Sequence, residues 1–260
     1  MKRLMVYWAL SVMAMGMHAQ NECIDVEPLV VMGDSIEYHS DTISSSNVTI
    51  YDFPYSRTLS MPDKRGLVYN TAALYGAGVV TLGVLELLPE NATAWNKSKL
   101  RETPLFERWW KHVSHGPVWD HDNAVFNYLL HPYGGAAYFM SGRTRGLNMW
   151  QAALYSAAVS TIFWEYGIEA FMEYPSIQDL IITPVVGSVL GECFYMVKRH
   201  IVADGYCLWG SRFLGGLVAW LVDPVNEFVG LFAGNPCRES RHTAFSFTHT
   251  PHQVALSISF

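Results

Sequence analysis

The 260-residue chain contains few charged residues: Asp, Glu, Lys and Arg make up 15% of it, whereas 50% is hydrophobic. Soluble proteins average about a quarter charged residues. This composition argues against a disordered chain, a coiled coil, a collagen-like fibre or a polar single-domain enzyme of the ordinary type. The net charge is −6 and the basic residues are scattered, so we expect no nucleic-acid partner.

The common catalytic and metal-binding motifs are also absent. The chain has no G-x-S-x-G elbow, no P-loop and no H-E-x-x-H, and His112 and His115 share an H-x-x-H spacing without the glutamate that a zinc protease needs. A site that combines His131 with Glu165 and Glu169 is conceivable, but no spacing specifies it. We therefore assign no metal, leave the cofactor unknown and leave open whether the protein is an enzyme.

Only four cysteines occur, and no two form a C-x-x-C pair. Cys207 and Cys237 flank one apolar segment, so they would pair only if the chain doubled back. The cysteines alone do not define a disulfide framework.

The first residues have the pattern of an export signal. Lys2 and Arg3 precede an uncharged run over residues 4–17, which predicts a secretory signal peptide over residues 1–19. Cleavage is expected after Ala19 or, alternatively, before Met17. An uncleaved anchor is the other interpretation, but the run is short for a membrane core of about 30 Å. Residues 20–65, rich in Ser, Thr, Asp and Pro, are interpreted as a polar periplasmic arm.

Four apolar segments follow, over residues 67–85, 146–164, 180–197 and 213–232. Small residues recur in them at spacings of three and four, which indicates helices. We predict an all-α fold over residues 66–234, a bundle of five to seven helices that is membrane-embedded or membrane-associated. Ser176 is predicted to cap a helix, Gly187 and Gly191 to allow close helix packing, and Pro184 and Pro224 to kink their helices.

Residues 235–260 are expected to form a short C-terminal tail of β type. Val254, Leu256, Ile258 and Phe260 alternate with small or polar residues. A strand that ends in Phe is typical of outer-membrane barrels. A single edge strand or a frayed tail is the alternative.

Polar residues recur inside the apolar region at helical spacing. Asp120, Asn123, Asn127 and His131 are expected to form one stripe on a helix that begins near Asp120. Three acidic residues, Glu165, Glu169 and Glu173, follow one another at four-residue steps. Carboxylates on one helical face repel one another unless partners or protons intervene, so at least one should have a raised pKa.

These polar residues support three interpretations. In the first they form a site, with catalytic Asp120, His131, Glu165 and Glu169, and with ligand-binding Asn123, Asn127, Arg143, Arg145, Glu173, Asp179 and Glu192. In the second they form an ion-pair network that fixes helix packing, with Arg143, Arg145 and Arg212 as the counter-ions. In the third, an ion or proton pathway runs through Glu165, Glu169, Glu192 and Asp223.

Three motifs carry a resemblance to a family. They are W-D-x-D-x4-N-x3-H-P-Y-x-G from Trp119, W-E-Y-x-x-E from Trp164, and P-S-x-Q-D-x3-T-P-x-x-G-x3-G-E, which ends at Glu192. Together they resemble an uncharacterised domain-of-unknown-function family of exported helical envelope proteins of Gram-negative bacteria. The resemblance implies an envelope location and no particular activity.

Two functional hypotheses follow. The first is an envelope membrane protein that binds or modifies a lipid or glycolipid head group at the polar residues, with membrane lipid as its partner. The second is a non-enzymatic scaffold or assembly factor with an envelope protein as its partner. The outer membrane or its periplasmic face is favoured over the inner membrane.

Overall fold

The computed structural model describes residues 48–87, 89, 102–119, 125–239, 244–250 and 253–259. The predicted signal peptide, most of the predicted arm, Asp120 and Asn123 lie outside these residues. The eight α-helices of the described residues are α2 (Lys64–Leu87), α5 (Leu105–His115), α6 (His131–Arg143), α7 (Met149–Ala158), α8 (Ile177–Ala203), α9 (Arg212–Val222), α10 (Pro224–Ala233) and α11 (Pro236–Glu239).

Shorter elements complete the described chain. Two are π-helical, η3 (Phe126–Leu130) and η4 (Val159–Ile168), and two are 3-10 helices, η2 (Ile50–Asp52) and η5 (Glu169–Phe171). Strands β1 (Ala244–Thr250) and β2 (Gln253–Ser259) pair antiparallel, with Ala244 opposite Ser259.

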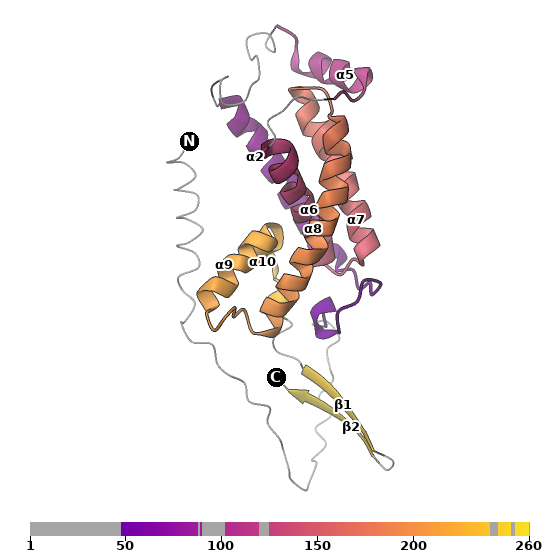
Figure 1. The fold of residues 1–260 in the computed structure, drawn as a ribbon, viewed down its shortest axis with the longest axis vertical. Coiled ribbons are helices and arrows are strands. Elements are labelled where there is room, and N and C mark those ends of the chain that lie inside the picture. The colour runs from indigo at the N-terminus through magenta and orange to yellow at the C-terminus, as the bar shows by residue number, and fades with distance from the viewer. Residues whose placement is uncertain are drawn as a thin grey trace.

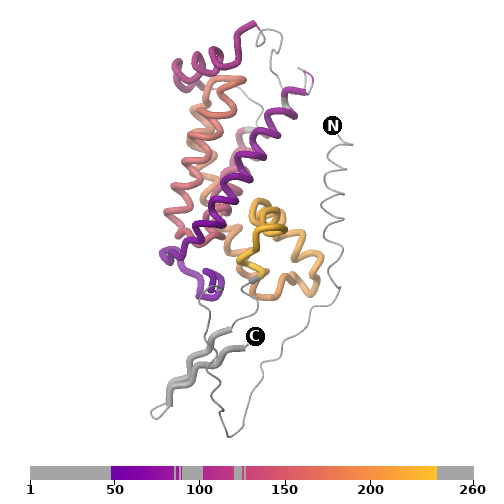
Figure 2. Tube along the Cα trace, turned by 180° about the vertical axis from the view of Figure 1, so that it is seen from behind, coloured from indigo at the N-terminus to yellow at the C-terminus, as the bar shows by residue number. Residues whose placement is uncertain are grey.

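The long helices lie side by side along the longest axis of the molecule (Figure 1). Helix α6 packs most extensively against α8 and next against α7, and α2 packs against α10, α6 and η4. Helix α5 lies across one end, whereas α9 and α10 lie towards the other (Figures 1 and 2). All four apolar segments are helical, so the prediction of a helical fold is confirmed.

The closest packing in the bundle joins α6 to α8 through glycines. A Cβ on Gly135 would lie 1.8 Å from the Thr183 carbonyl oxygen, and one on Gly187 would lie 2.6 Å from the Gly135 Cα. Only glycine allows two helix backbones to approach so closely. The approach also brings His131, one turn before Gly135, against the turn of α8 that contains Thr183.

The start of α8 agrees with the sequence. The Ser176 side chain accepts a hydrogen bond of 3.2 Å from the backbone N–H of Asp179, as an N-cap does. The helix then continues through Pro184 to Ala203. The predicted capping residue is therefore confirmed.

Pro224 breaks the last apolar segment instead of kinking one helix. Helix α9 ends at Val222, α10 begins at Pro224, and the two axes meet at 107°. Proline lacks the N–H that an interior helical residue donates, but it is well suited to the first position of a new helix. The expectation of a kinked single helix was wrong here.

The described end of the predicted arm packs on the bundle. The Met61 N–H donates to the Gly146 carbonyl at 2.8 Å, and the Asp63 N–H donates to the Arg145 carbonyl at 2.8 Å. Arg143 Nη2 donates to the Ser56 carbonyl at 2.6 Å. Residues 56–63 are thus held by backbone hydrogen bonds from Met61 and Asp63 to the turn after α6, and by a side-chain hydrogen bond from Arg143 at the end of α6.

The bundle has charged groups inside and apolar groups outside. Glu165, Arg143 and Lys198 are 0% exposed, whereas Val79, Leu154 and Val189 are 63%, 73% and 67% exposed. Helix α2 over Lys64–Val84 and helix α8 are long and apolar enough to cross a membrane, and α9 with α10 would count as a third, bent span. This distribution of polarity is compatible with membrane association.

Candidate functional site

A histidine and two acidic residues from different segments converge near the end of the bundle where α8 begins. Potential ligand atoms of His131, Glu165 and Asp179 all lie within 4.8 Å of one another. His131 Nδ1 is 3.6 Å from Asp179 Oδ1 and 3.2 Å from Thr183 Oγ1. Together with Glu169, these three residues are called the carboxylate–histidine cluster below.

Local backbone structure explains how the cluster assembles. His131 begins α6 directly after the π-helical η3, and Glu165 lies within the π-helical η4. π-Helical turns are rare and occur frequently at functional sites. Glu165 Oε2 also accepts a hydrogen bond of 3.0 Å from the Ser176 N–H at the start of α8, where a helix dipole favours negative charge.

Burial raises the pKa of both glutamates of the cluster. It raises the pKa of Glu165 to about 8; the hydrogen bond from the Ser176 N–H opposes this rise and the charge of Asp179 adds to it. Burial, followed by the charge of Glu165, raises the pKa of Glu169 well above its ordinary value. The cluster therefore retains protons near neutral pH, so it can both donate and accept hydrogen bonds.

Three buried polar atoms of the segment that contains Glu165 and Glu169 accept no hydrogen bond from an N–H or hydroxyl group of the described residues. They are Glu165 Oε1, Glu169 Oε2 and Ser160 Oγ, and the two carboxyl groups can hydrogen-bond each other only when one of them is protonated. Such a group costs about 1–3 kcal/mol when it is buried without a partner. Native proteins keep few of them, so each requires a physical explanation.

The expected arginine counter-ions are not at this cluster. In the described part of the chain, no lysine or arginine forms an ion pair with Glu165 or Glu169. Arg212 Nε has no hydrogen-bond partner there either. The prediction that Arg143, Arg145 and Arg212 neutralise the Glu-rich segment was wrong.

Helix length explains why the arginines are elsewhere. His131 is the first residue of α6 and Arg143 the last, which separates them by about 18 Å along the axis. At that far end, Arg143 Nε donates to Glu192 Oε2 at 3.1 Å, and its guanidinium lies 4.0 Å from the ring centre of Tyr195. Arg145 pairs with Asp63 at 3.1 Å.

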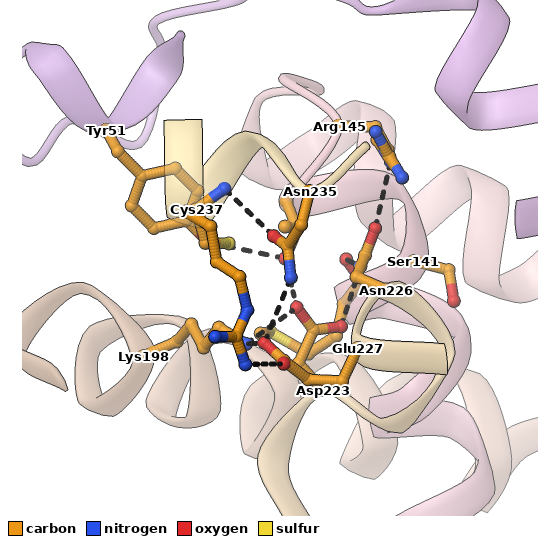
Figure 3. A network of polar contacts seen from close by, with 12 residues as sticks. Tyr51, Ser141, Arg145, Lys198, Asp223, Asn226, Glu227, Asn235 and Cys237 are labelled. Carbon is orange, nitrogen blue, oxygen red and sulfur yellow. Dashed lines mark hydrogen bonds and ion pairs between the residues drawn. The ribbon is translucent and has the colours of Figure 1, made fainter. Parts of the chain in front are cut away.

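A second buried network occupies that far end (Figure 3). Lys198 Nζ pairs with Glu227 and lies 3.6 Å from Asp223 Oδ2. Asp223 also accepts hydrogen bonds from Thr144 and Asn226, at 3.0 and 2.6 Å. We call these five residues the Lys198 network.

The carboxylates of the Lys198 network are fully paired. Glu227 accepts further hydrogen bonds from Tyr206 at 2.8 Å, Asn235 at 3.3 Å and Arg238 at 3.2 Å. A buried ionic group that is paired and hydrogen-bonded in this way fixes structure and leaves no atom for a ligand. The network is therefore assigned to helix packing.

The predicted pathway residues also divide between these places. Glu192 pairs with Arg143 and also accepts a hydrogen bond of 2.6 Å from the Tyr55 hydroxyl. Asp223 belongs to the Lys198 network. Glu165 and Glu169 lie at the other end of the bundle, so in the described residues these four acidic groups do not share one network.

Two further predicted site residues, Asn127 and Glu173, lie in the segments that precede His131 and follow Glu169. Asn127 is 3% exposed within η3. Glu173 follows the end of η5, so it does not share a regular helical face with Glu165 and Glu169 as expected. Sequence reasoning assigned no role to Thr183, although Thr183 belongs to the P-S-x-Q-D-x3-T-P motif, or to Ser160, which belongs to none of the three motifs. It also missed Lys198, which lies beside Arg199 near the end of α8.

The two histidines of the H-x-x-H pair, His112 and His115, make packing contacts between α5 and the segment after η4. His112 Nδ1 lies 2.9 Å from the Ala170 carbonyl oxygen, and both His112 and His115 contact the Tyr174 ring. Trp109 Nε1 donates to the Tyr166 carbonyl at 2.9 Å. These contacts dock α5 onto the segment that contains Glu169.

The cysteines differ in state. Cys207 is disulfide-bonded, whereas Cys193 is an exposed free thiol and Cys237 a buried one. A bridge between Cys207 and Cys237 is therefore excluded.

Comparison with known proteins gives one match. Residues 116–225 match the model of a family described as a domain of unknown function (DUF3943), which supports the resemblance to an uncharacterised family. The match covers less than half of the chain but includes every residue of the carboxylate–histidine cluster. No curated protein and no solved structure matches the chain.

Proposed function

We propose that the protein is a membrane protein of the cell envelope that binds a lipid or glycolipid, with the head group at the carboxylate–histidine cluster. The observation that carries the proposal is an apolar groove between α7 and α8 that begins one residue after Thr183. The groove has a volume of about 590 Å³. Small-molecule sites typically measure about 300–1,000 Å³.

The lining of the groove suits an acyl chain. Its charged lining residues are Arg57 and Glu192, and the others are Phe139, Met149, Trp150, Ala153, Ala157, Pro184, Val185, Ser188, Val189, Cys193 and Met196. From Pro184 to Met196 it follows α8 for about 18 Å. That length is close to half of a hydrocarbon core of about 30 Å, the depth of one lipid leaflet.

The position of the cluster suits a head group. If α8 crosses the membrane, its first turn lies near the interface, and Asp179 and Thr183 belong to its first two turns. Protonated and ionised carboxyl groups together hydrogen-bond hydroxyl-rich or amine-bearing head groups. The unpartnered Glu165 Oε1 and Glu169 Oε2 would then be satisfied by the ligand.

The envelope location rests on the sequence. The predicted export signal favours the cell envelope, and the family resemblance favours the outer membrane or its periplasmic face over the inner membrane. The disulfide at Cys207 suits an oxidising compartment.

Filling the groove tests lipid binding. Ala157→Phe places a ring in the groove, whereas Ala158→Phe places the same ring on the neighbouring exposed residue outside it. The protein is purified in mild detergent from membranes, and bound lipid is counted by native mass spectrometry. We expect Ala158→Phe to retain the lipid of the parent chain and Ala157→Phe to lose it. Equal retention by the two variants would contradict the proposal.

The alternative function is a non-enzymatic envelope scaffold, and the fully paired Lys198 network favours it because those buried charges only hold helices together. A scaffold predicts that no lipid is retained and that substitutions at His131 and Glu169 lower abundance.

A further inference from the structure

The carboxylate–histidine cluster has the composition of a metal site, although the sequence carries no metal-binding motif. We propose that His131, Glu165 and Asp179 bind a divalent transition-metal ion of the Zn²⁺ type. Their potential ligand atoms lie within 4.8 Å of one another. The three residues are separated by 34 and 14 positions in the chain, which explains why no short motif indicates the site.

The distances suit a small tetrahedral ion. Zn²⁺ binds imidazole nitrogen and carboxylate oxygen at about 2.0–2.2 Å, so neighbouring ligands of a tetrahedral ion lie about 3.4 Å apart. His131 Nδ1 and Asp179 Oδ1 are 3.6 Å apart. Only a small closing movement is needed for these two atoms to share an ion.

A second observation points to a ligand independently of the clustering. Glu165 is 0% exposed, and no N–H or hydroxyl group of the described residues donates to its Oε1, while its Oε2 accepts from the Ser176 N–H. The Glu169 carboxyl can hydrogen-bond Glu165 only through a proton, which a metal ion would displace. One oxygen is therefore held by the protein and the other is available within the cluster. A bound cation would satisfy that oxygen and offset the cost of burying the carboxylate.

The ligand types select the class of metal. An imidazole nitrogen with carboxylate oxygens favours first-row transition metals, whereas Mg²⁺ and Ca²⁺ prefer oxygen ligands alone. Within this series Zn²⁺ binds more tightly than Mn²⁺ or Fe²⁺. These three ligands from the described residues leave one position open on a four-coordinate ion. This open position takes an oxygen of the lipid head group, a role for the metal ion that rests on the proposed function.

The test measures metal binding directly and does not depend on lipid. The full chain in detergent is stripped with EDTA and titrated with ZnCl₂, MnCl₂ or MgCl₂, and bound metal is counted after dialysis. We expect one Zn²⁺ per chain, weaker Mn²⁺ binding, and no displacement of Zn²⁺ by Mg²⁺. Co²⁺ bound in place of Zn²⁺ should give visible absorption from a four- or five-coordinate ion.

Two variants and a control locate the site. Asp179→Asn keeps the side-chain shape, and because Ser176 bonds the backbone N–H of residue 179, it also keeps the helix cap. Asp179→Asn and His131→Ala should each weaken Zn²⁺ binding more than about tenfold, since loss even of a supporting group costs about 10–100-fold. His200→Ala removes a histidine whose side chain is 66% exposed, and it should bind Zn²⁺ like the parent chain.

Two results would overturn the metal proposal: no Zn²⁺ bound by the parent chain, or equal binding by the parent, His131→Ala and Asp179→Asn. Lipid retention without Zn²⁺ binding would refute the metal site and leave the proposed function standing. Zn²⁺ binding without lipid retention would refute the proposed function and leave the metal site standing.

Discussion

The stability of the protein should respond in opposite ways when an ionisable group is removed from the Lys198 network and from the carboxylate–histidine cluster. Lys198→Met deletes the ammonium group of the Lys198 network and leaves Asp223 and Glu227 buried without their main cation. Removing one partner of a buried ion pair costs about 3–5 kcal/mol. For a chain of this size one kcal/mol corresponds to about 2–4 °C in Tm, so we expect a decrease of about 6–20 °C.

Glu165→Gln should leave stability unchanged or increase it. The glutamine oxygen can still accept the hydrogen bond from the Ser176 N–H, and the amide NH2 that replaces Oε1 can donate to the neighbouring acidic side chains. Pairing a buried group that had no partner is worth up to about 1–3 kcal/mol. A site that binds a ligand sacrifices stability in this way, whereas a structural network does not.

Thermal unfolding of the metal-free proteins in one detergent, at one scan rate, compares the two variants with the parent chain. The reasoning is refuted if Glu165→Gln lowers Tm as much as Lys198→Met does. It is also refuted if Lys198→Met unfolds at the parent temperature.

Three further predictions concern packing, thiol chemistry and the membrane. Gly135→Ala should lower the free energy of unfolding by about 1–3 kcal/mol because α6 and α8 must separate. Gly134→Ala should not lower it, since the added Cβ would meet nothing closer than 3.9 Å. Equal Tm values for the two variants would contradict this prediction. At pH 8 a maleimide should modify Cys237 only after unfolding, because burial raises the pKa of the Cys237 thiol to about 12 and keeps it protonated. Modification of Cys237 in the folded protein, seen by mass spectrometry, would refute this burial. Val79→Lys places a charge on the exposed face of α2 and should cost about 2.5–3.5 kcal/mol of insertion free energy. Alkaline extraction should therefore release more of the Val79→Lys protein from membranes than of the Val79→Leu protein. Equal extraction would argue against a membrane position for this face.

The sequence predicted those parts of the fold that depend on local pattern. Apolar segments became helices, Ser176 capped α8, and Gly187 packed closely on α6. These features need only neighbours in the chain or on one helical face. The break at Pro224 was harder to predict, because proline fits the start of a new helix as well as a kink.

The contents of the candidate site were predicted less completely. His131, Glu165 and Asp179 were named from the sequence, but their convergence depends on two π-helical segments and on the contact of Gly135 with α8. The prediction of the counter-ions was wrong because charge pairing depends on which end of α6 an arginine occupies. Arg143 is closer in the sequence to Glu165 than to Glu192, but it lies at the end of α6 that contacts Glu192.

The most direct test of whether the carboxylate–histidine cluster is a binding site is native mass spectrometry, with metal analysis, of the protein purified from fractionated membranes. The parent chain is compared with His131→Ala and with a double variant that combines Glu165→Gln and Glu169→Gln. We predict a lipid or a metal ion that accompanies the parent chain and is absent from both variants, while the variants remain folded and abundant. If nothing accompanies the parent chain and the variants fail to accumulate, the cluster is structural and the account is wrong.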